Sequence, residues 1–182
     1  MGGAFVMERF SIWLRRSVFA VLFVALIFTI YRHYFAIDKT QEAVIGEVTP
    51  NFRLQTINDG ELELKDLRGQ ALLINFWGSW CTPCKNEMPA IQNAYEQYKN
   101  DGFEVVAVNI YESATTVSTF LQKNNLSIPV VLDKNGEVYN TFNVRYVPTS
   151  FFITPDGTLQ SSYEGELSKE QLDQWIKEIL PN

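Results

Sequence analysis

The sequence is poor in the residues that most often build metal sites and nucleophilic catalytic centres. Its 182 residues include two cysteines and one histidine, His33. A structural zinc ion needs about four ligands, and this chain offers too few. A c-type haem attachment site needs a histidine directly after the second cysteine, but Lys85 follows Cys84. A protease-like cysteine nucleophile needs a histidine folded beside it, and His33 lies beyond a polar segment. We therefore expect no metal and no cofactor.

The chain also lacks an excess of basic residues. It has 15 Lys and Arg against 21 Asp and Glu, which gives a formal net charge of −6 and a pI near 4.8. Binding to nucleic acid requires a basic face, so nucleic acid is excluded as a partner. No internal repeat or low-complexity tract is present. The length and the 46% hydrophobic content predict one globular domain plus a short additional segment.

The additional segment is an uncharged apolar run over residues 17–31. A membrane-spanning helix needs about 20 residues. Arg32 can extend its charge back to the interface, and apolar residues resume at 34–37, so we expect a single transmembrane signal-anchor. A cleaved signal peptide is the alternative, but the bulky Tyr34 and Phe35 suit its cleavage site poorly. A buried core helix is disfavoured because no polar face interrupts the run.

Flanking charges predict the orientation of this anchor. Arg9, Arg15 and Arg16 precede the apolar run, whereas Arg32 and Lys39 follow it. Because cytoplasmic flanks carry the excess of basic residues, we expect the N-terminus in the cytoplasm. The domain would then lie on the extracytoplasmic face of the cell membrane. Whether translation starts at Met1 or Met7 does not change this expectation.

The remaining chain predicts an α/β domain. We expect a cytoplasmic stub and anchor over residues 1–37, a polar tether over 38–49, and the domain over 50–182. Within the domain, strands at 71–77, 104–110 and 128–133 are separated by helices at about 81–99 and 114–124, with hairpins at both ends and a last helix capped by Ser168. Strands separated by helices favour a parallel core with right-handed crossovers. The terminal hairpins make the sheet mixed, with helices flanking it.

Both cysteines lie in the segment NFWGSWCTPCKNEMP, residues 75–89. The pair could be a structural disulfide, but closing so short a loop removes little chain entropy. The pair instead follows a buried strand and opens a helix, where backbone N–H groups and the helix dipole stabilise a thiolate. Pro83 fits the first helical turn. We therefore expect an exposed Cys81 that attacks and a deeper Cys84 that resolves.

This segment, the upstream TPNFRL and DLRG segments and the downstream YVPTSFFITPDG resemble the membrane-anchored thioredoxin-like oxidoreductases of the ResA and TlpA group. The resemblance covers nearly the whole chain. It implies a thioredoxin-like fold, with the mixed sheet and flanking helices expected above. It also implies a thiol–disulfide oxidoreductase that acts on proteins.

Several site residues follow from the resemblance. Cys81 and Cys84 match the family's redox-active disulfide, and Trp80 matches its active-site tryptophan. Pro148 matches the cis-proline that faces the cysteines in this fold. Val147, directly before it, would offer backbone groups that pair with the substrate chain. Trp80, Val147 and Pro148 are therefore the expected substrate-binding residues.

Glu87 allows two interpretations. By position alone it is a solvated glutamate in an early helical turn, where the helix dipole favours a negative charge. The resemblance instead implies a catalytic, semi-buried carboxylate that relays protons for Cys84 and raises the pKa of the Cys81 thiol. Asn75 agrees with the second interpretation, because it places a neutral side chain where classical thioredoxins have an acidic one.

The resemblance further implies the biological role. It points to reduction of the CxxCH disulfide of apocytochrome c during cytochrome c maturation, with a CcdA-type membrane thiol donor restoring the dithiol. Thr82 departs from the family pattern, which has an acid there, so the pair could be more oxidising than usual. The alternatives are an oxidant of secreted proteins, a reductant of other cell-envelope proteins, and a membrane-tethered binding module with a structural disulfide.

Overall fold

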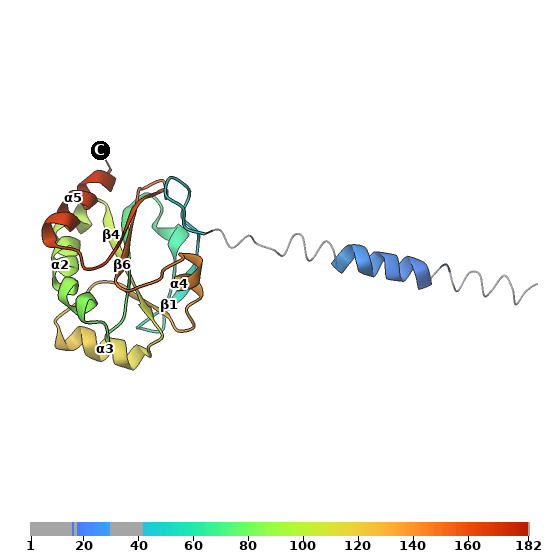
Figure 1. Cartoon of the computed structure of the whole chain (residues 1–182), viewed down its shortest axis with the longest axis horizontal. Coiled ribbons are helices and arrows are strands. Elements are labelled where there is room, and N and C mark those ends of the chain that lie inside the picture. Colours follow the sequence, from blue (N-terminus) through green and yellow to red (C-terminus); the bar gives the residue numbers. More distant parts are fainter. Residues whose placement is uncertain (1–15, 17, 30–41, 182) are drawn as a thin grey trace, which may run out of the picture. The chain divides into compact units, whose positions relative to one another are not determined.

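The computed structural model describes residue 16, residues 18–29 and residues 42–181. The chain divides into two units, residues 1–40 and residues 41–182, and Figure 1 shows the described parts of both. In the first unit, residues 18–29 are helical and their apolar side chains are exposed, Phe19 at 71%. None of the helices in the described ranges has the length and apolarity needed to cross a membrane.

Several sequence predictions fall outside the described residues. These are both ends of the predicted anchor, most of its flanking charges, His33 and the first part of the predicted tether.

The second unit is built on one mixed sheet in the order β2-β1-β5-β4-β3-β6-β7. The three central strands β3, β4 and β5 are parallel, and every other pairing is antiparallel. The strands are β1 Arg53–Thr56, β2 Glu61–Glu63, β3 Ala71–Trp77, β4 Phe103–Ile110, β5 Val130–Asp133, β6 Thr149–Ile153 and β7 Leu159–Glu164.

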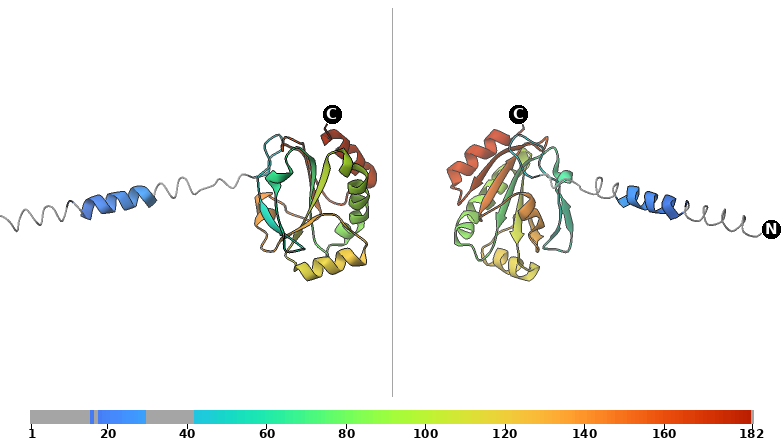
Figure 2. Two further views of the ribbon diagram at one scale, coloured as in Figure 1. Left: turned by 180° about the vertical axis from the view of Figure 1, so that it is seen from behind. Right: turned by 45° about the vertical axis from the view of Figure 1, so that its right-hand side comes forward.

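Helices cover both faces of this sheet. They are α2 Thr82–Tyr98, α3 Ala114–Lys123, α4 Glu137–Thr141 and α5 Lys169–Ile179, with short 3-10 segments at Leu64–Leu67 and Lys99–Asp101. Helices α2, α3 and α5 pack over one face and α4 over the other, as Figures 1 and 2 show. β3 is buried along its whole length, since it feeds apolar side chains alternately into both cores.

The predicted strands, hairpins and long helices are confirmed to within a few residues. The hairpin around Asp59 pairs Arg53 with Glu63, and the closing hairpin pairs β6 with β7. Ser168 caps α5, accepting from the amide of Gln171 while the Gln171 side chain accepts from Ser168. This reciprocal capping satisfies two amides that the first helical turn leaves free.

The structure corrects two sequence predictions. The five-residue helix α4 was not predicted, because it is too short to show helical periodicity. The predicted tether over 38–49 is too long at its C-terminal end: the amides of Gly46 and Thr49 donate to the carbonyls of Leu159 and Gly157, and Val48 forms a bridge with Thr158. Residues 46–49 therefore belong to the domain.

Candidate active site

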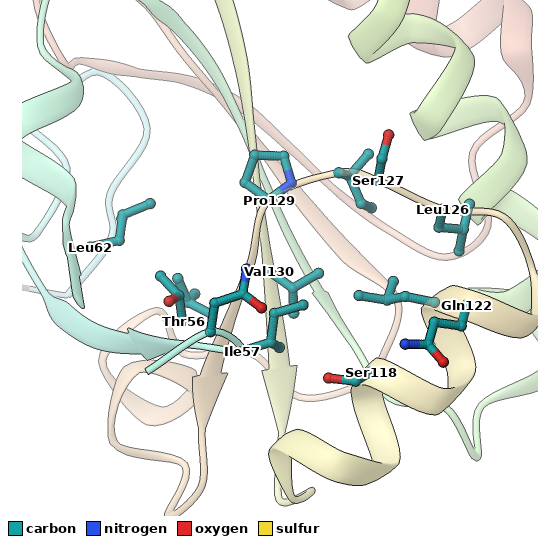
Figure 3. A pocket seen from close by; sticks show the side chains of 13 residues that line it. Thr56, Ile57, Leu62, Ser118, Gln122, Leu126, Ser127, Pro129 and Val130 are labelled. Atoms are coloured by element: carbon teal, nitrogen blue, oxygen red, sulfur yellow. The ribbon is translucent and has the colours of Figure 1, made fainter. Parts of the chain in front are cut away.

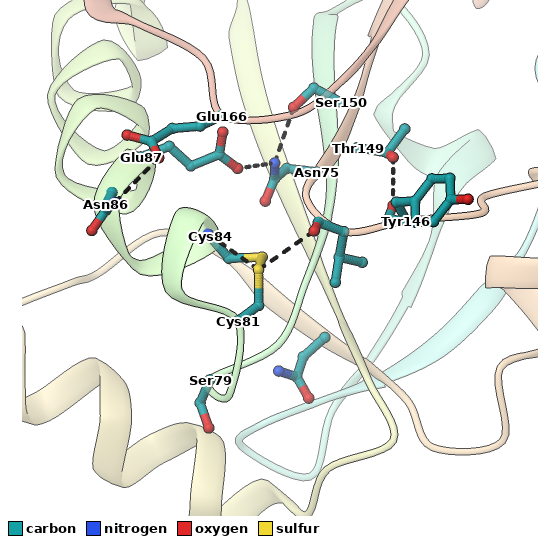
Figure 4. Close-up of a disulfide and its surroundings, with 12 residues drawn as sticks. Asn75, Ser79, Cys81, Cys84, Asn86, Glu87, Tyr146, Thr149, Ser150 and Glu166 are labelled. Carbon is teal, nitrogen blue, oxygen red and sulfur yellow. Dashed lines mark hydrogen bonds between the residues drawn. A yellow bond between two sulfur atoms is a disulfide. The ribbon is translucent and has the colours of Figure 1, made fainter.

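Cys81 and Cys84 form a disulfide where β3 gives way to α2 (Figure 4). Cys81 is the N-cap residue of α2, and its Sγ accepts the backbone N–H of Cys84 at 3.2 Å. An N–H group at the start of a helix favours negative charge on the atom it faces. This end of α2 therefore stabilises the thiolate that Cys81 forms once the disulfide is reduced.

The two sulfurs differ in access. Cys81 is 6% exposed and Cys84 is fully buried. The expectation of a freely exposed Cys81 is corrected, because the chain before β6 covers it: the carbonyl oxygen of Val147 lies 3.5 Å from Cys81 Sγ. Only Cys81 retains solvent-accessible surface, so an external disulfide can meet this residue and not Cys84.

The covering segment contains the Val147–Pro148 peptide bond, which is cis. The structure therefore places Val147, Pro148 and Cys81 together, as the resemblance implied. Trp80 also lies here and is 59% exposed. Its indole packs so closely on Gly78 that a Cβ at residue 78 would lie 2.6 Å from the ring, so glycine is required for this arrangement.

Glu87 lies one helical turn beyond Cys84, on the same face of α2, and is 1% exposed. The solvated interpretation is thus wrong. Its Oε1 accepts from Asn75 Nδ2 at 2.8 Å and its Oε2 from the Leu167 amide at 2.9 Å. Burial raises the pKa of Glu87 to about 7, although these two hydrogen bonds act in the opposite direction. A carboxyl group with such a pKa can exchange a proton near neutral pH.

Asn75 connects Glu87 to the central sheet. It is fully buried on β3, and its Nδ2 also donates to Ser150 Oγ on β6 at 3.0 Å. Its Oδ1 has no hydrogen-bond partner. The Asn75 amide therefore donates one hydrogen bond to the Glu87 carboxylate and stabilises its charged form.

Replacing Asn75 by leucine should raise the pKa of Glu87 above about 7, since the charged carboxylate loses one of its two donors. Carboxyl NMR titration of the oxidised protein would measure this pKa. Asn109→Leu is the matched control, because Asn109 is also buried on a central strand but donates to Glu112. An unchanged or lower pKa in Asn75→Leu would contradict the role given to this amide.

A second carboxylate, missed in the sequence, holds the loop that precedes Cys81. Glu112 accepts from the Ser79 amide at 2.7 Å and the Ser79 hydroxyl at 2.6 Å, and from Asn109 Nδ2 at 2.8 Å. Glu112 follows β4 closely, and the ends of adjacent parallel strands meet at one edge of a sheet. Its place directly after a predicted strand could therefore have marked Glu112 as a site residue from the sequence alone.

A separate pocket of about 450 Å³ lies between the β1–β2 turn, α3 and the segment before β5 (Figure 3). No charged side chain, histidine or cysteine lines it, and it shares no residue with the disulfide site. Over the part of the chain that the structure describes, no three His, Cys, Asp or Glu residues are grouped so as to hold a metal ion.

Comparisons with known proteins agree with this geometry. Residues 45–162 match the AhpC/TSA family. The thiol-disulfide oxidoreductase ResA of Bacillus cereus is 37% identical over 175 residues, which cover 96% of this chain and all of that protein. The chain belongs to the AhpC/TSA family and, within it, is a ResA-like thiol–disulfide oxidoreductase.

Similar solved structures include thiol:disulfide interchange proteins. A putative thiol:disulfide interchange protein DsbE from Chlorobium tepidum superposes with a TM-score of 0.72 at 31% identity, covering 77% of this chain and all of that one. StoA from Bacillus subtilis gives 0.62 at 32% identity, covering 73% and 98%. The fold is thioredoxin-like, and the activity is thiol–disulfide exchange with protein disulfides.

Proposed function

We propose that this protein is a reductant of disulfides in proteins outside the cytoplasm, tethered by its N-terminal apolar segment. The asymmetry of the cysteine pair supports this most strongly. Cys81 keeps accessible surface at a helix N-terminus, whereas Cys84 is sealed and has a buried carboxyl group one turn away. Such an arrangement suits a dithiol that attacks with one sulfur and resolves with the other.

The reaction proceeds in two exchanges. The Cys81 thiolate attacks one sulfur of the substrate disulfide, a mixed disulfide forms and one substrate thiolate leaves. Cys84 then loses its proton, for which Glu87 is the nearest buried acceptor along α2, and attacks Cys81 Sγ. The second substrate thiolate leaves and Cys81–Cys84 is oxidised. Two electrons pass to the substrate, and two protons complete its thiols.

For the substrate we propose the CxxCH disulfide of apocytochrome c, which must be reduced before haem attaches. A CcdA-type membrane protein would then return electrons to Cys81–Cys84. The support is the ResA-like sequence over nearly the whole chain. The segment over residues 17–37 would form the anchor, and the arginines that precede it would keep its N-terminus in the cytoplasm.

Trapping in cells tests this proposal. In Cys84→Ser the second exchange cannot occur, so Cys81 should retain its substrate as a mixed disulfide that mass spectrometry can identify. Recovery of an apocytochrome c supports the proposal, and recovery of another envelope protein reassigns the substrate. If nothing is trapped, the binding-module alternative with a purely structural disulfide is favoured.

An oxidant is the second candidate, because Thr82 between the cysteines is neutral, whereas the ResA-like pattern has an acid there. The loss of a nearby negative charge favours the Cys81 thiolate and hence the reduced form. A reduction potential near about −120 mV would indicate an oxidant, and one well below about −200 mV a reductant. Equilibration with glutathione or dithiothreitol would measure it.

A further inference from the structure

A pocket of about 330 Å³ opens beside the disulfide and is lined largely by aromatic side chains. Its lining comes from three separate parts of the fold: Trp80, Ile110, Tyr111, Tyr139, Arg145, Tyr146 and Val147. Val147 also supplies the carbonyl oxygen 3.5 Å from Cys81 Sγ, and Trp80 directly precedes Cys81. The pocket is therefore continuous with the position at which a substrate disulfide must approach.

The aromatic lining is open to solvent. Trp80, Tyr111 and Tyr146 are 59%, 56% and 70% exposed. Large exposed aromatic side chains grouped in a depression are typical of a binding surface, since each offers apolar area with few rotatable bonds.

Tyr111 is held in place by an unusual backbone. Its φ is +61°, a conformation that bulky residues rarely adopt. Its ring lies against Gly136, where a Cβ would come within 2.2 Å of Tyr111 Oη, and it packs in a tilted arrangement on Tyr139, with ring centroids 6.2 Å apart. The fold thus maintains an exposed tyrosine beside the disulfide at a cost in backbone energy.

Arg145 sets the charge of the pocket. It is exposed, and among the described residues no carboxylate lies within 4.0 Å of its guanidinium group. An unpaired cation at this position repels lysine and arginine side chains of a substrate. The protein as a whole carries a net charge of −6 and attracts basic substrates at long range, whereas Arg145 repels them within the pocket.

We propose that this pocket selects polypeptide substrates carrying a large apolar side chain, Phe in particular, within two residues of the attacked cystine, and disfavours a basic residue there. The inference rests on the proposed function, in which Cys81 attacks a polypeptide disulfide. A substrate strand alongside Val147 would direct alternate side chains to one side, which brings a residue near the cystine into the pocket.

Single-turnover kinetics test the proposal. The full chain, reduced and held in detergent micelles, is mixed with an excess of octapeptides containing an intramolecular Cys-Ala-Ala-Cys disulfide. The peptides differ only in Phe, Ala or Lys at each of the two positions on either side of the cystine. Acid quenching, alkylation and mass spectrometry give the rate constant for oxidation of Cys81–Cys84.

The Phe peptide should react at least tenfold faster than the Ala peptide at one or more positions, and the Lys peptide more slowly than the Ala peptide. Tenfold corresponds to about 1.4 kcal/mol, which partial burial of a Phe ring can supply. Tyr111→Asn should reduce the Phe/Ala ratio below about threefold, because asparagine tolerates the positive φ but lacks the ring. Tyr146→Ala should act likewise, and Arg145→Ala should remove only the discrimination against Lys.

Tyr95→Ala is the matched control, because Tyr95 is a half-buried tyrosine on α2 that does not line the pocket. Its Phe/Ala ratio should equal that of the natural chain. Equal rates for the three peptides, or a ratio that survives both tyrosine substitutions, would overturn the pocket proposal while leaving the reductase intact. Failure to reduce any peptide would instead overturn the proposed function, and the pocket proposal with it.

Discussion

Cys81→Ser should abolish the reduction of polypeptide disulfides, lowering the turnover rate by at least about a thousandfold. A serine oxygen cannot form the mixed disulfide, and Cys84 cannot take over the attack because it is fully buried. The measurement is the rate of peptide-disulfide reduction with a chemical reductant that regenerates the dithiol.

Cys84→Ser should behave differently from Cys81→Ser, although both variants lack the disulfide. Its Cys81 still attacks, so one equivalent of substrate thiol should appear and the reaction should then stop at the mixed disulfide. Lys85→Ala is the control, since Lys85 is exposed and adjacent to the pair. It should keep the natural turnover rate within about threefold, as surface substitutions usually do.

Unfolding of the serine variants would not account for their loss of turnover. The disulfide closes a loop of only four residues, for which the chain-entropy relation gives about 2 kcal/mol, and domains of this size are typically stable by about 5–15 kcal/mol. Circular dichroism of both serine variants should match that of the reduced natural chain. Turnover retained in Cys81→Ser would show that Cys84 can attack and would reverse the assigned roles.

Local sequence signals predicted the parts of this site that depend on neighbouring residues. A buried apolar strand followed by a helix opening at Cys81 was evident, because the capping and proline signals lie within a few positions of each other. The helix predicted to begin near residue 81 begins at Thr82 with Cys81 as its N-cap, and the predicted extent of β3 is confirmed.

The local sequence pattern did not show the burial of Glu87, which only the family resemblance implied. Its burial depends on the Leu167 amide, 80 residues further on, and on Asn75 of another strand. The same limit applies to Cys81, whose access is restricted by a carbonyl 66 residues away. The aromatic pocket also gathers side chains from three distant segments, so no local pattern revealed it.

Glu87→Gln should change how the stability of the oxidised protein depends on pH. In the natural chain the folded state raises the pKa of Glu87 from 4.5 to about 7. Below pH 4.5 the carboxyl is protonated in both the folded and the unfolded chain, so its burial does not lower the free energy of unfolding there. As the pH rises from 4.5 through about 7, the carboxyl ionises in the unfolded chain while it stays largely protonated in the folded chain. The free energy of unfolding therefore falls. The difference corresponds to about 3 kcal/mol at high pH.

Glutamine does not ionise, so Glu87→Gln does not lose stability in this way. The difference in free energy of unfolding, Glu87→Gln minus the natural chain, should therefore rise by about 3 kcal/mol between pH 4.5 and pH 8. Urea unfolding of both oxidised proteins across this range measures it, and the oxidised state keeps the cysteines from titrating. Glu96→Gln is the control, because Glu96 is exposed on the same helix. Glu96 pairs with Lys99 at the surface, where an ion pair contributes at most about 1 kcal/mol, so the change in this variant over the same range should stay well below that expected for Glu87→Gln.

The same substitution should slow the release of substrate from the mixed disulfide by about a hundredfold, the usual contribution of a positioned proton acceptor. In the natural chain this step should accelerate as the pH rises through about 7, when Glu87 becomes able to accept the Cys84 proton. In Glu87→Gln that inflection should vanish, leaving only the titration of the thiol itself. Stopped-flow measurement of the second exchange tests this. If Glu87 were only structural, Glu87→Gln would change the pH dependence of stability, but its rate of the second exchange would keep the inflection near pH 7.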